Sequence, residues 1–520
     1  MPTRRGAAAG LAVLACAVAA CAVFSGALAY PFSQDDWSHL ARARGLVPPL
    51  PGPWRSLSLA AFFEIVRAPF GLHPLPYHVV SLAAHAACGV LLYLFLRRRL
   101  APASACLASV FFVAHPALFT VPYWISAIGD ALSLGFALAA LLLWESRARW
   151  RALAVPLFAL SLLCKESTLL FPVVLLAARA SDAADTRSPL RDPVWWACFA
   201  LSIAAGIDLV VGRAAETAEA GSALPYAFGV GGHLWRNALT YLGWALNFTY
   251  PTVPGYSDAV DPRYYAWGAA ALALWIAGIF LMPGRRRAWI AAAVVWLAWI
   301  GPVLALRRHT LHYYEYAAMT AVAWMVGIAF DAALTTRRRR ESGKRRAAPP
   351  RTSLREEARP VLAAVLGALL VVNGRAVVKR IENAPLGHYG LRANSTVNRA
   401  LVGQRIHDAI AKAELPAHTN LYFWSPARHF VPVDTTLAET YWERNARAAT
   451  QDGLSVRLLF PQIDSVTFLR HPRPIPERDR YVVYGVDGSS AIATWGRVDS
   501  VNARLPVAPP APAGAPEQHE

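Results

Sequence analysis

Long apolar runs recur along the chain and constrain its fold more than any other feature of the sequence. The apolar core of a bilayer is about 30 Å thick, and an α-helix needs about 20 apolar residues to cross it. The two runs that flank Lys165 and Glu166 are short. The sequence therefore predicts an α-helical polytopic membrane protein with about 11 spans. The candidate spans are residues 9–30, 77–96, 103–122, 127–144, 152–164, 167–178, 194–211, 264–281, 288–306, 313–333 and 360–378.

Composition excludes the main alternatives to a membrane protein. The chain is 56% hydrophobic and 16% charged, whereas soluble domains are about 45–50% apolar and about 25% charged. Its 51 basic and 33 acidic residues give a net charge of +18. A nucleic-acid-binding protein can carry such a charge, but not together with this many apolar runs. A soluble, disordered or fibrous protein is therefore excluded, and no nucleic-acid partner is expected.

Arginine and lysine collect in every second loop, which indicates how the chain is oriented in the membrane. Cytoplasmic loops carry such an excess of positive charge. We therefore expect a multi-pass protein of the inner or plasma membrane, with its N-terminus in the cytoplasm and its C-terminal region outside. Residues 236–250 would break the alternation if they crossed, so we interpret them as an interfacial or re-entrant helix on the outer side. The basic segments are residues 4–5, 97–99, 147–151, 179–191, 285–287 and 337–346.

The first thirty residues fit two interpretations. The start MPTRR, an apolar run and the small residues from Ser25 to Ala29 are also typical of a secretory signal peptide with its cleavage site. Small residues are common throughout this chain, however, and the segment Gln34-Asp35-Asp36-Trp37 follows almost at once. We therefore favour a retained first helix, which would hold these acidic residues at the membrane face.

The C-terminal part of the chain reads as a separate unit. A helix-like segment at 395–414 precedes β-type runs at 421–424, 456–460, 466–469 and 481–486, which predicts a small extracytoplasmic α/β domain. The whole chain then divides into a multi-span membrane domain at 1–334 with its first external loop at 31–76, a basic cytoplasmic linker at 335–359, a last transmembrane helix at 360–378, the α/β domain at 379–505 and a disordered tail at 506–520.

Asp35 and Asp36 follow the first predicted span directly on the outer side. Two neighbouring carboxylates can remove a proton from an acceptor hydroxyl or amide, and proximity of like charges with burial raises one pKa towards useful basicity. The alternative is an acidic pair in a solvated loop. The sequence alone leaves both interpretations open.

Lys165 and Glu166 are the stronger signal. A charged pair between two apolar runs is costly near the bilayer unless it is paired or faces a polar cavity. The chain has four lysines, and Lys165 is the only one in its first 343 residues. A lysine at the outer membrane face can bind a lipid-linked phosphate as a point charge. The alternative is an internal ion pair that holds two short helices together.

Further polar residues lie within or at the ends of the predicted spans, mostly at the outer ends. A single histidine in such a place is more often a packing residue than a ligand, but several on one face suggest a shared site. These residues are His78, His85, His115, Asp130, Asp208, His309, His312, Tyr313, Tyr314 and Glu315.

Taken together, these segments resemble the GT-C glycosyltransferases, and in particular the membrane protein O-mannosyltransferases. Residues 77–85 are similar to the family's "YHxxNxxxH" pattern, and His115-Pro116 with Trp124-Ile125-Ser126 and Asp130 is similar to its "HP…WISxRxD" segment. Residues 164–172 resemble "SKExxxxxP", and residues 312–316 loosely resemble the start of the "RYLYLP" helix. The order and spacing agree over roughly residues 1–330.

This resemblance implies inverting transfer of a sugar from a polyprenyl-phosphate donor at the outer membrane face. It places the catalytic base at Asp35 and Asp36, and Lys165 near the donor phosphate with Glu166 orienting it. His115 and Asp130 would line the same cavity, with His309 and Tyr313 as further substrate-binding residues. No metal is obligatory in the mannosyltransferase branch, although a divalent metal stays open. The partners implied are membrane lipid, the sugar donor, and an acceptor that is a protein hydroxyl, a lipid or a cell-envelope glycan.

Departures from the family pattern leave two rival functions open. Ile128 stands where "WISxRxD" usually has arginine, Arg55-Ser56-Leu57 replaces the common "RPL", and the TPR repeats of some animal relatives are absent. A missing donor-binding cation would fit a catalytically inactive GT-C-like scaffold. A transporter or flippase is the other rival, but it favours charges at mid-span and internal repeats, and no convincing repeat is present.

Overall fold

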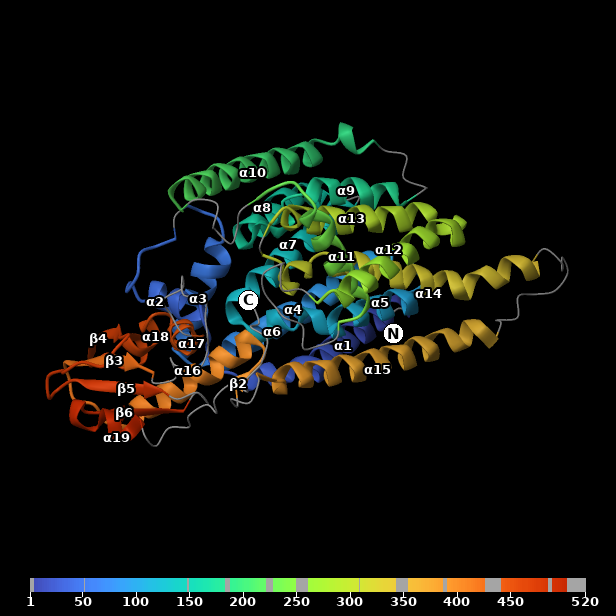
Figure 1. Ribbon diagram of the computed structural model, residues 1–520. Helices are drawn as coiled ribbons and strands as arrows, with labels where there is room; N and C mark the ends of the chain where they lie inside the picture. The colour runs from blue at the N-terminus through green and yellow to red at the C-terminus, as the bar shows by residue number, and fades with distance from the viewer. Residues whose placement is uncertain are drawn as a thin grey trace.

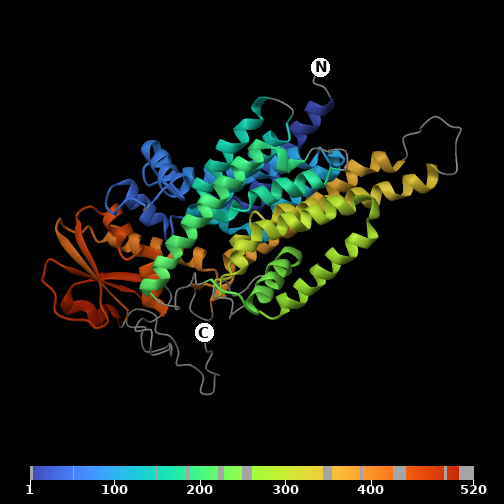
Figure 2. The same cartoon turned by 90° about the horizontal axis from the view of Figure 1, so that it is seen from above.

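The computed structural model shows a mostly helical protein with a small mixed sheet near its C-terminal end (Figure 1). The described residues also include a two-stranded antiparallel sheet of β1 (Pro385–Leu386) and β2 (Leu391–Arg392). A long bundle of helices occupies most of the molecule, and the mixed sheet lies at one end of it, as a second view confirms (Figure 2). The structure describes residues 4–50, 52–146, 149–182, 188–220, 228–248, 261–307, 309–342, 354–386, 391–425, 441–484 and 489–502.

Long helices form the frame of the bundle, and shorter ones fill the spaces between them and form the first loop. The long helices are α1 (Arg4–Phe24), α4 (Pro74–Leu96), α7 (Ile128–Trp144), α10 (Pro193–Ala220), α12 (Arg263–Leu281), α13 (Arg286–Leu304), α14 (Met319–Ser342) and α15 (Leu354–Asn383). The shorter ones are α2 (Asp36–Ala43), α3 (Phe62–Phe70), α5 (Pro102–Ala114), α6 (Thr120–Tyr123), α8 (Ala154–Cys164), α9 (Phe171–Ala180) and α11 (His233–Leu246).

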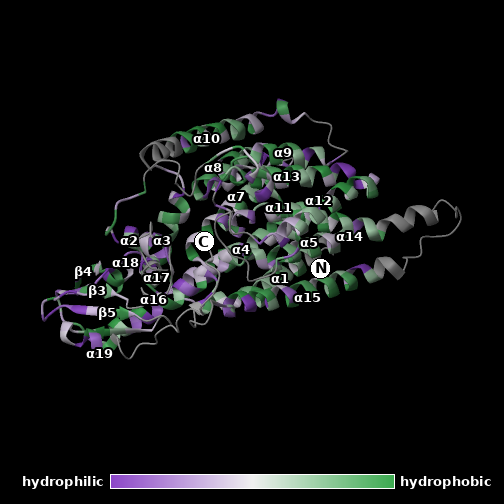
Figure 3. Cartoon of the chain, in the orientation of Figure 1, coloured by the Kyte–Doolittle hydropathy of each residue, from purple (hydrophilic) through white to green (hydrophobic). Residues whose placement is uncertain are grey.

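The helical part has the length, composition and exposed apolar surface of an integral membrane protein. Among the described residues, seven helices are long and apolar enough to cross a bilayer, or eight if a bent pair counts as one span. The α10, α12 and α15 helices are largely apolar (Figure 3), and large apolar side chains on them are exposed, among them Ile207 on α10 and Val372 on α15. Such surfaces are stable only against lipid or another apolar partner. The full count of eleven crossings stays a prediction.

Two predicted spans have different bounds in the structure. The span at 103–122 is broken at His115 into α5 and a short segment, Pro116–Tyr123, and the two are bent by 49°. Pro116 explains the break, because proline disfavours the helical conformation of the residue before it, and His115 is extended. The span predicted at 313–333 begins only at Met319, because a 3₁₀ turn, η10 (His312–Glu315), precedes it.

Arginines predicted to share one side of the membrane do come together at one end of the bundle. Arg99 pairs with Glu145 and donates to the Ala178 carbonyl at 3.0 Å. Arg285 donates to the Arg99 carbonyl at 3.3 Å and pairs with Asp331. These contacts join the ends of α4, α7 and α9 and the start of α13 to Asp331 of α14, as the alternation of charged loops predicts. Which side of the membrane this face occupies stays a prediction.

The α8 and α9 helices are short and are joined by a turn at Lys165. Both pack against α10, and the structure ends α8 at Cys164, where Lys165 takes an extended conformation. A single 3₁₀ turn, η6 (Glu166–Thr168), then leads towards α9, which has Pro172 in its first turn. Proline is tolerated at that place because the first N–H groups of a helix have no intrahelical partner. The predicted pair of short apolar segments around Lys165-Glu166 is thus present.

The predicted re-entrant segment at 236–250 corresponds to α11, which packs closely against α12. Gly243 and Gly268 permit this approach, because a Cβ atom at either would collide with the backbone of the facing helix. Residues 249 and 250 lie outside the described residues. The position of α11 relative to a membrane stays a prediction.

The C-terminal region contains a four-stranded sheet of order β4-β3-β5-β6. The strands are β3 (Thr419–Trp424), β4 (Ile463–Phe468), β5 (Arg480–Tyr484) and β6 (Ser490–Ala493); β3 is parallel to β4 and β5, and β6 is antiparallel to β5. The accompanying helices are α16 (Ser395–Lys412), α17 (Tyr441–Thr450), α18 (Leu454–Leu459) and α19 (Val498–Asn502).

One strand prediction in this region is wrong, and two boundaries differ. The sequence predicts a β-type run at 456–460, but these residues lie mostly in α18, which begins after Gly453 with its φ of 86°. Its leucines pack against the first loop instead of extending the sheet. The predicted linker 335–359 is partly helical, since α14 continues to Ser342 and α15 begins at Leu354. Residues 343–353, 485–488 and the predicted tail 506–520 lie outside the described residues.

Candidate functional site

Asp36 is a buried structural anchor of the first loop. Its carboxylate accepts hydrogen bonds from the Ser33 backbone N–H at 2.9 Å, from the Ser126 backbone N–H at 2.8 Å and from the Ser126 hydroxyl. Burial raises the pKa of Asp36 to about 7, although the hydrogen bonds from Ser126 and Ser33 act against that rise. These bonds tie the segment after α1 to the turn before α7.

Asp35 has a different environment from its neighbour. It stands at the N-cap of α2 and is exposed, whereas Asp36 is buried. Partial loss of water around it raises the pKa of Asp35, and the positive charges of Arg399 and Arg55 oppose this rise. Of the two predicted catalytic aspartates, Asp35 is therefore the one that a substrate can reach.

Lys165 is paired with Asp130, not with the adjacent Glu166. Its Nζ lies 2.7 Å from Asp130 Oδ2, and the side chains are 12% and 2% exposed, respectively. The same Nζ lies 5.0 Å from the ring centre of Tyr313 and 5.6 Å from that of Tyr314. A cation can be held over aromatic rings in this way. The structure thus brings three of the predicted site residues, Lys165, Asp130 and Tyr313, into one cluster.

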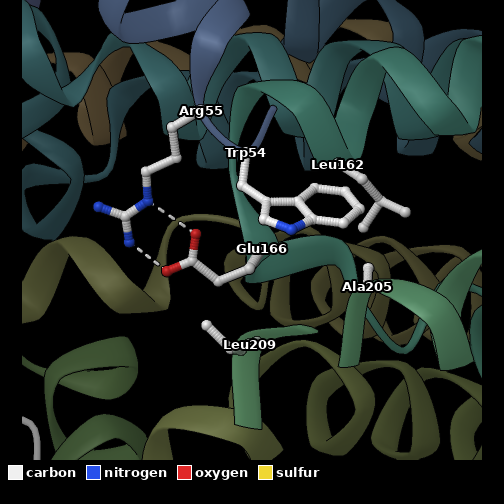
Figure 4. Close-up of a pocket in the computed structure, with 6 residues that line it drawn as sticks. All are labelled: Trp54, Arg55, Leu162, Glu166, Ala205 and Leu209. Atoms are coloured by element: carbon white, nitrogen blue, oxygen red, sulfur yellow. Dashed lines mark hydrogen bonds and ion pairs between the residues drawn. The ribbon is translucent and has the colours of Figure 1, made fainter. Parts of the chain in front are cut away.

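Glu166 pairs with Arg55 of the first loop. Arg55 Nε donates to Glu166 Oε2 at 2.8 Å, and a second nitrogen of Arg55 contacts the other carboxylate oxygen, which makes the pair bidentate (Figure 4). Desolvation acts to raise the pKa of Glu166, but the charges of Arg55 and Lys165 and the hydrogen bonds from Arg55 lower it to about 2. Ser58 adds a second tie, since its hydroxyl donates to the Cys164 carbonyl at 2.6 Å. The first loop is therefore fastened to the turn that carries Lys165.

A small cavity opens beside the Arg55–Glu166 pair. Its volume is about 100 Å³, and Figure 4 shows the Trp54 indole on one side of it and residues of α10 on another. The Trp54 indole N–H donates to Asp208 of α10. Of the predicted site residues, Glu166 lines this cavity. The full lining is Trp54, Arg55, Leu162, Glu166, Ala205 and Leu209.

Two predicted histidines have contacts that serve packing. His115 Nδ1 accepts a hydrogen bond from the Ala117 N–H at 3.3 Å, and its ring faces Phe111 and the backbone of Ala245. The ring of His309 packs against Tyr314, with ring centres 5.8 Å apart. The contacts of His115 named here do not join it to Asp35 or to the Lys165–Asp130 pair, whereas His309 touches Tyr314, one of the two rings beside Lys165. Their predicted roles in substrate binding stay predictions.

Three residues that the sequence analysis did not assign to the site contact or act on its predicted residues: Arg55, Ser126 and Arg399. Arg55 entered the sequence comparison only as part of a departure from the "RPL" pattern, yet it contacts Glu166 and acts on the charge of Asp35. Ser126 lies in the segment that resembles the family's "WIS" pattern, but this resemblance did not indicate that it would bind Asp36. Arg399 is one of two arginines in α16, and no sequence pattern distinguishes it from the other.

Metal ligands do not cluster in the described part of the chain. No group of three or more histidine, cysteine, aspartate or glutamate side chains there is placed to hold a metal ion.

Comparisons with known proteins give similarity only at the level of solved structures. No protein-family model matches the chain, and no curated protein matches it either. The crystal structure of ArnT from Cupriavidus metallidurans bound to undecaprenyl phosphate aligns with a TM-score of 0.48 and 13% identity, covering 91% of this chain and 93% of that one. The oligosaccharyltransferase AglB from Archaeoglobus fulgidus, in complex with an inhibitory peptide and a dolichol-phosphate, aligns with a TM-score of 0.42 and 11% identity, covering 88% and 64%.

Proposed function

We propose that this protein is a GT-C-type glycosyltransferase that moves a sugar from a polyprenyl-phosphate donor to an acceptor at the outer membrane face. The acceptor is a protein hydroxyl, a lipid or a cell-envelope glycan. The observation that carries the proposal is the first loop itself. It presents the exposed Asp35 and is fastened through Arg55 to the turn with Lys165. Arg55 supports this proposal from both sides, because its charge acts on the pKa of Asp35 and its guanidinium pairs with Glu166 beside Lys165.

Asp35 is the proposed base. Its carboxylate takes the proton of the acceptor hydroxyl while the acceptor oxygen attacks the anomeric carbon of the sugar. The bond between that carbon and the phosphate oxygen breaks in the same step, so the configuration inverts and polyprenyl phosphate leaves. Asp36 is buried and accepts three hydrogen bonds, so it fits the role of holding the loop rather than accepting a proton.

Lys165 is the proposed cation for the leaving phosphate. It stabilises the negative charge that develops on the phosphate as the bond breaks. Asp130 holds the lysine in place in the absence of the donor, and the Tyr313 ring keeps the ammonium oriented. Arg55 is held by Glu166 next to this cluster, where a second positive charge compensates in part for the arginine that the family pattern has at position 128.

The test is a transfer assay with purified protein in lipid vesicles. The vesicles contain a radiolabelled sugar on polyprenyl phosphate, and candidate acceptors are added as membrane lipid, as envelope glycan and as protein. We expect label in one acceptor and an equal amount of free polyprenyl phosphate. Donor binding without transfer would support the inactive scaffold instead, and movement of the donor between leaflets without transfer would support a flippase.

A further inference from the structure

The C-terminal α/β region touches the loop that carries the proposed base. Arg399 of α16 donates from Nη1 to the side-chain carbonyl of Gln34 at 2.5 Å, and Gln34 Nε2 donates to the Thr396 hydroxyl at 3.4 Å. The Ser33 hydroxyl donates to the Thr396 carbonyl at 3.3 Å. Both residues just before Asp35 are thus held by the first two turns of α16.

Gln34 is held in a conformation that it would not adopt by preference. Its φ is 53°, in the left-handed region that costs a non-glycine residue free energy unless neighbouring contacts stabilise it. Arg399 and Thr396 supply such contacts on its side chain. Since Gln34 precedes Asp35 directly, this backbone turn sets where the Asp35 carboxylate points.

Apolar contacts hold the same two parts together over a wider area. The ring of Trp37 meets the ring of His407 of α16 edge to face, with centres 5.2 Å apart. Leu458 of α18 is buried in one cluster with Trp37 and Leu40 of α2. The hydrogen bonds to Gln34 therefore belong to a packed interface between the first loop and the α/β region.

Charged groups reach Asp35 from three directions. Arg399 faces it from α16, Arg55 faces it from the first loop, and Asp36 is its neighbour in the chain. The two arginines favour the ionised carboxylate, which is the form that a base needs. Arg55 is engaged with Glu166, whereas Arg399 is engaged with the neutral amide of Gln34.

We propose that Arg399 is a positioning residue for Asp35, and that the α/β region completes the active site by supplying it. The proposal rests on the proposed function, because it assigns Asp35 the role of base. Arg399 holds the turn at Gln34, and its positive charge favours the ionised form of Asp35. The membrane part alone would lack both effects. The first turn of α16, which carries Thr396 and Arg399, is stabilised by an N-cap, because the Asn394 side chain accepts a hydrogen bond from the Val397 N–H at 3.0 Å.

The experiment compares Arg399→Gln, Arg399→Lys and the control Arg405→Gln in the full-length protein. Arg405 lies on the same helix and is exposed. For Arg399→Gln we expect kcat to fall about tenfold with KM for the donor unchanged, because a small displacement of a catalytic group is costly. The acid limb of kcat/KM should move up by roughly one pH unit, because loss of a positive charge raises the pKa of Asp35. Arg399→Lys should keep the limb near its original pH and recover part of kcat.

The outcomes separate this inference from the proposed function. If the wild type transfers sugar and Asp35→Asn abolishes transfer, while Arg399→Gln matches Arg405→Gln in both kcat and pH profile, the inference fails alone. If Asp35→Asn is as active as the wild type, the proposed base and the inference fail together. Thermal unfolding in detergent and elution as a single species distinguish a local effect from misfolding. An Arg399→Gln protein that unfolds early but shows the unshifted pH profile would also overturn the positioning role.

Discussion

The segments at Asp35-Asp36 and at Lys165-Glu166 each place two ionisable residues side by side, but they treat them differently. In the first, one acid is buried against neutral donors and the other is exposed. In the second, both residues form ion pairs with partners from other elements, Asp130 and Arg55. The neutral hydrogen-bond donors around Asp36 hold its carboxylate without neutralising the charge of Asp35. The ion pair with Asp130, by contrast, neutralises the charge of the Lys165 side chain that it holds. Under the proposed function, Asp35 needs no new partner before proton transfer, whereas Lys165 has to exchange Asp130 for the donor phosphate.

The largest effect should separate the two aspartates. We expect Asp35→Asn to lower the transfer rate by about 10³-fold, because a general base contributes about 10²–10⁴-fold, and to leave the melting temperature nearly unchanged, because Asp35 is exposed. The measurement is the initial rate of sugar transfer together with thermal unfolding of the same preparation. A variant that loses stability but keeps its rate would reverse the roles assigned to Asp35 and Asp36.

The next effect tests whether Lys165 serves the donor or only the fold. Removing one partner of a buried ion pair leaves the other charge unpaired and costs about 3–5 kcal/mol, so Lys165→Met alone should both unfold early and lose activity. The double variant Lys165→Met with Asp130→Leu should recover much of the stability. We expect it to stay about 10²-fold slower in transfer, as the loss of a charge-stabilising group predicts. Recovery of transfer along with stability would show that the pair is only structural.

A smaller effect concerns the pH dependence of stability through Asp36. Its pKa in the folded protein is about 7, above its ordinary value of 3.8, so the folded state holds a proton that the unfolded state has released between these values. Stability from this group is therefore greatest at low pH and falls as the pH rises from about 4 to about 7.

Asp36→Asn removes this titration and gives it a direct test. The amide oxygen can still accept from Ser126, but the amide nitrogen cannot accept from the Ser33 N–H, so we expect a loss of about 1–3 kcal/mol. The melting temperature of the variant should change less between pH 5 and 7 than that of the wild type. An equally steep pH dependence in both proteins would assign the effect to another group.

Hydropathy predicts where the long apolar helices lie, because the length of an apolar run is a local property of the sequence, while the count of eleven crossings stays a prediction. The hydropathy pattern did not predict the structure at two places, one where a proline interrupts an apolar run and one where an apolar run packs against a distant part of the chain. Pro116 breaks the third span at His115, and the apolar run at 456–460 forms α18 because the first loop offers its leucines a surface. The local sequence around 456–460 could not predict this contact, because the surface is formed by first-loop residues about four hundred positions away in the chain.

The sequence indicated which residue types belong to the candidate site, but not which of them contact each other. The lysine at 165 was conspicuous in the sequence, but its ion partner Asp130 lies 35 positions away, and adjacency suggested Glu166 instead. The difference between Asp35 and Asp36 depends on which of them faces Ser126, and a dipeptide gives no sign of that. Arg399 depends on an interface between two parts of the fold, so its role became visible only in three dimensions.

The smallest effect should come from the Arg55–Glu166 pair, and it sharpens the contrast between the two segments. Glu166 is partly exposed, with 30% of its side chain accessible, and such pairs contribute only about 0–1 kcal/mol. We expect Glu166→Gln to leave the melting temperature within a degree or two and to change donor KM by less than about fivefold, because Arg55 keeps its charge. Arg55→Gln should weaken donor binding more than Glu166→Gln does, since it removes a cation as well as a tie. Equal effects of the two variants would mean that the pair only fastens the loop, and Lys165 would then be left as the proposed phosphate cation of this cluster.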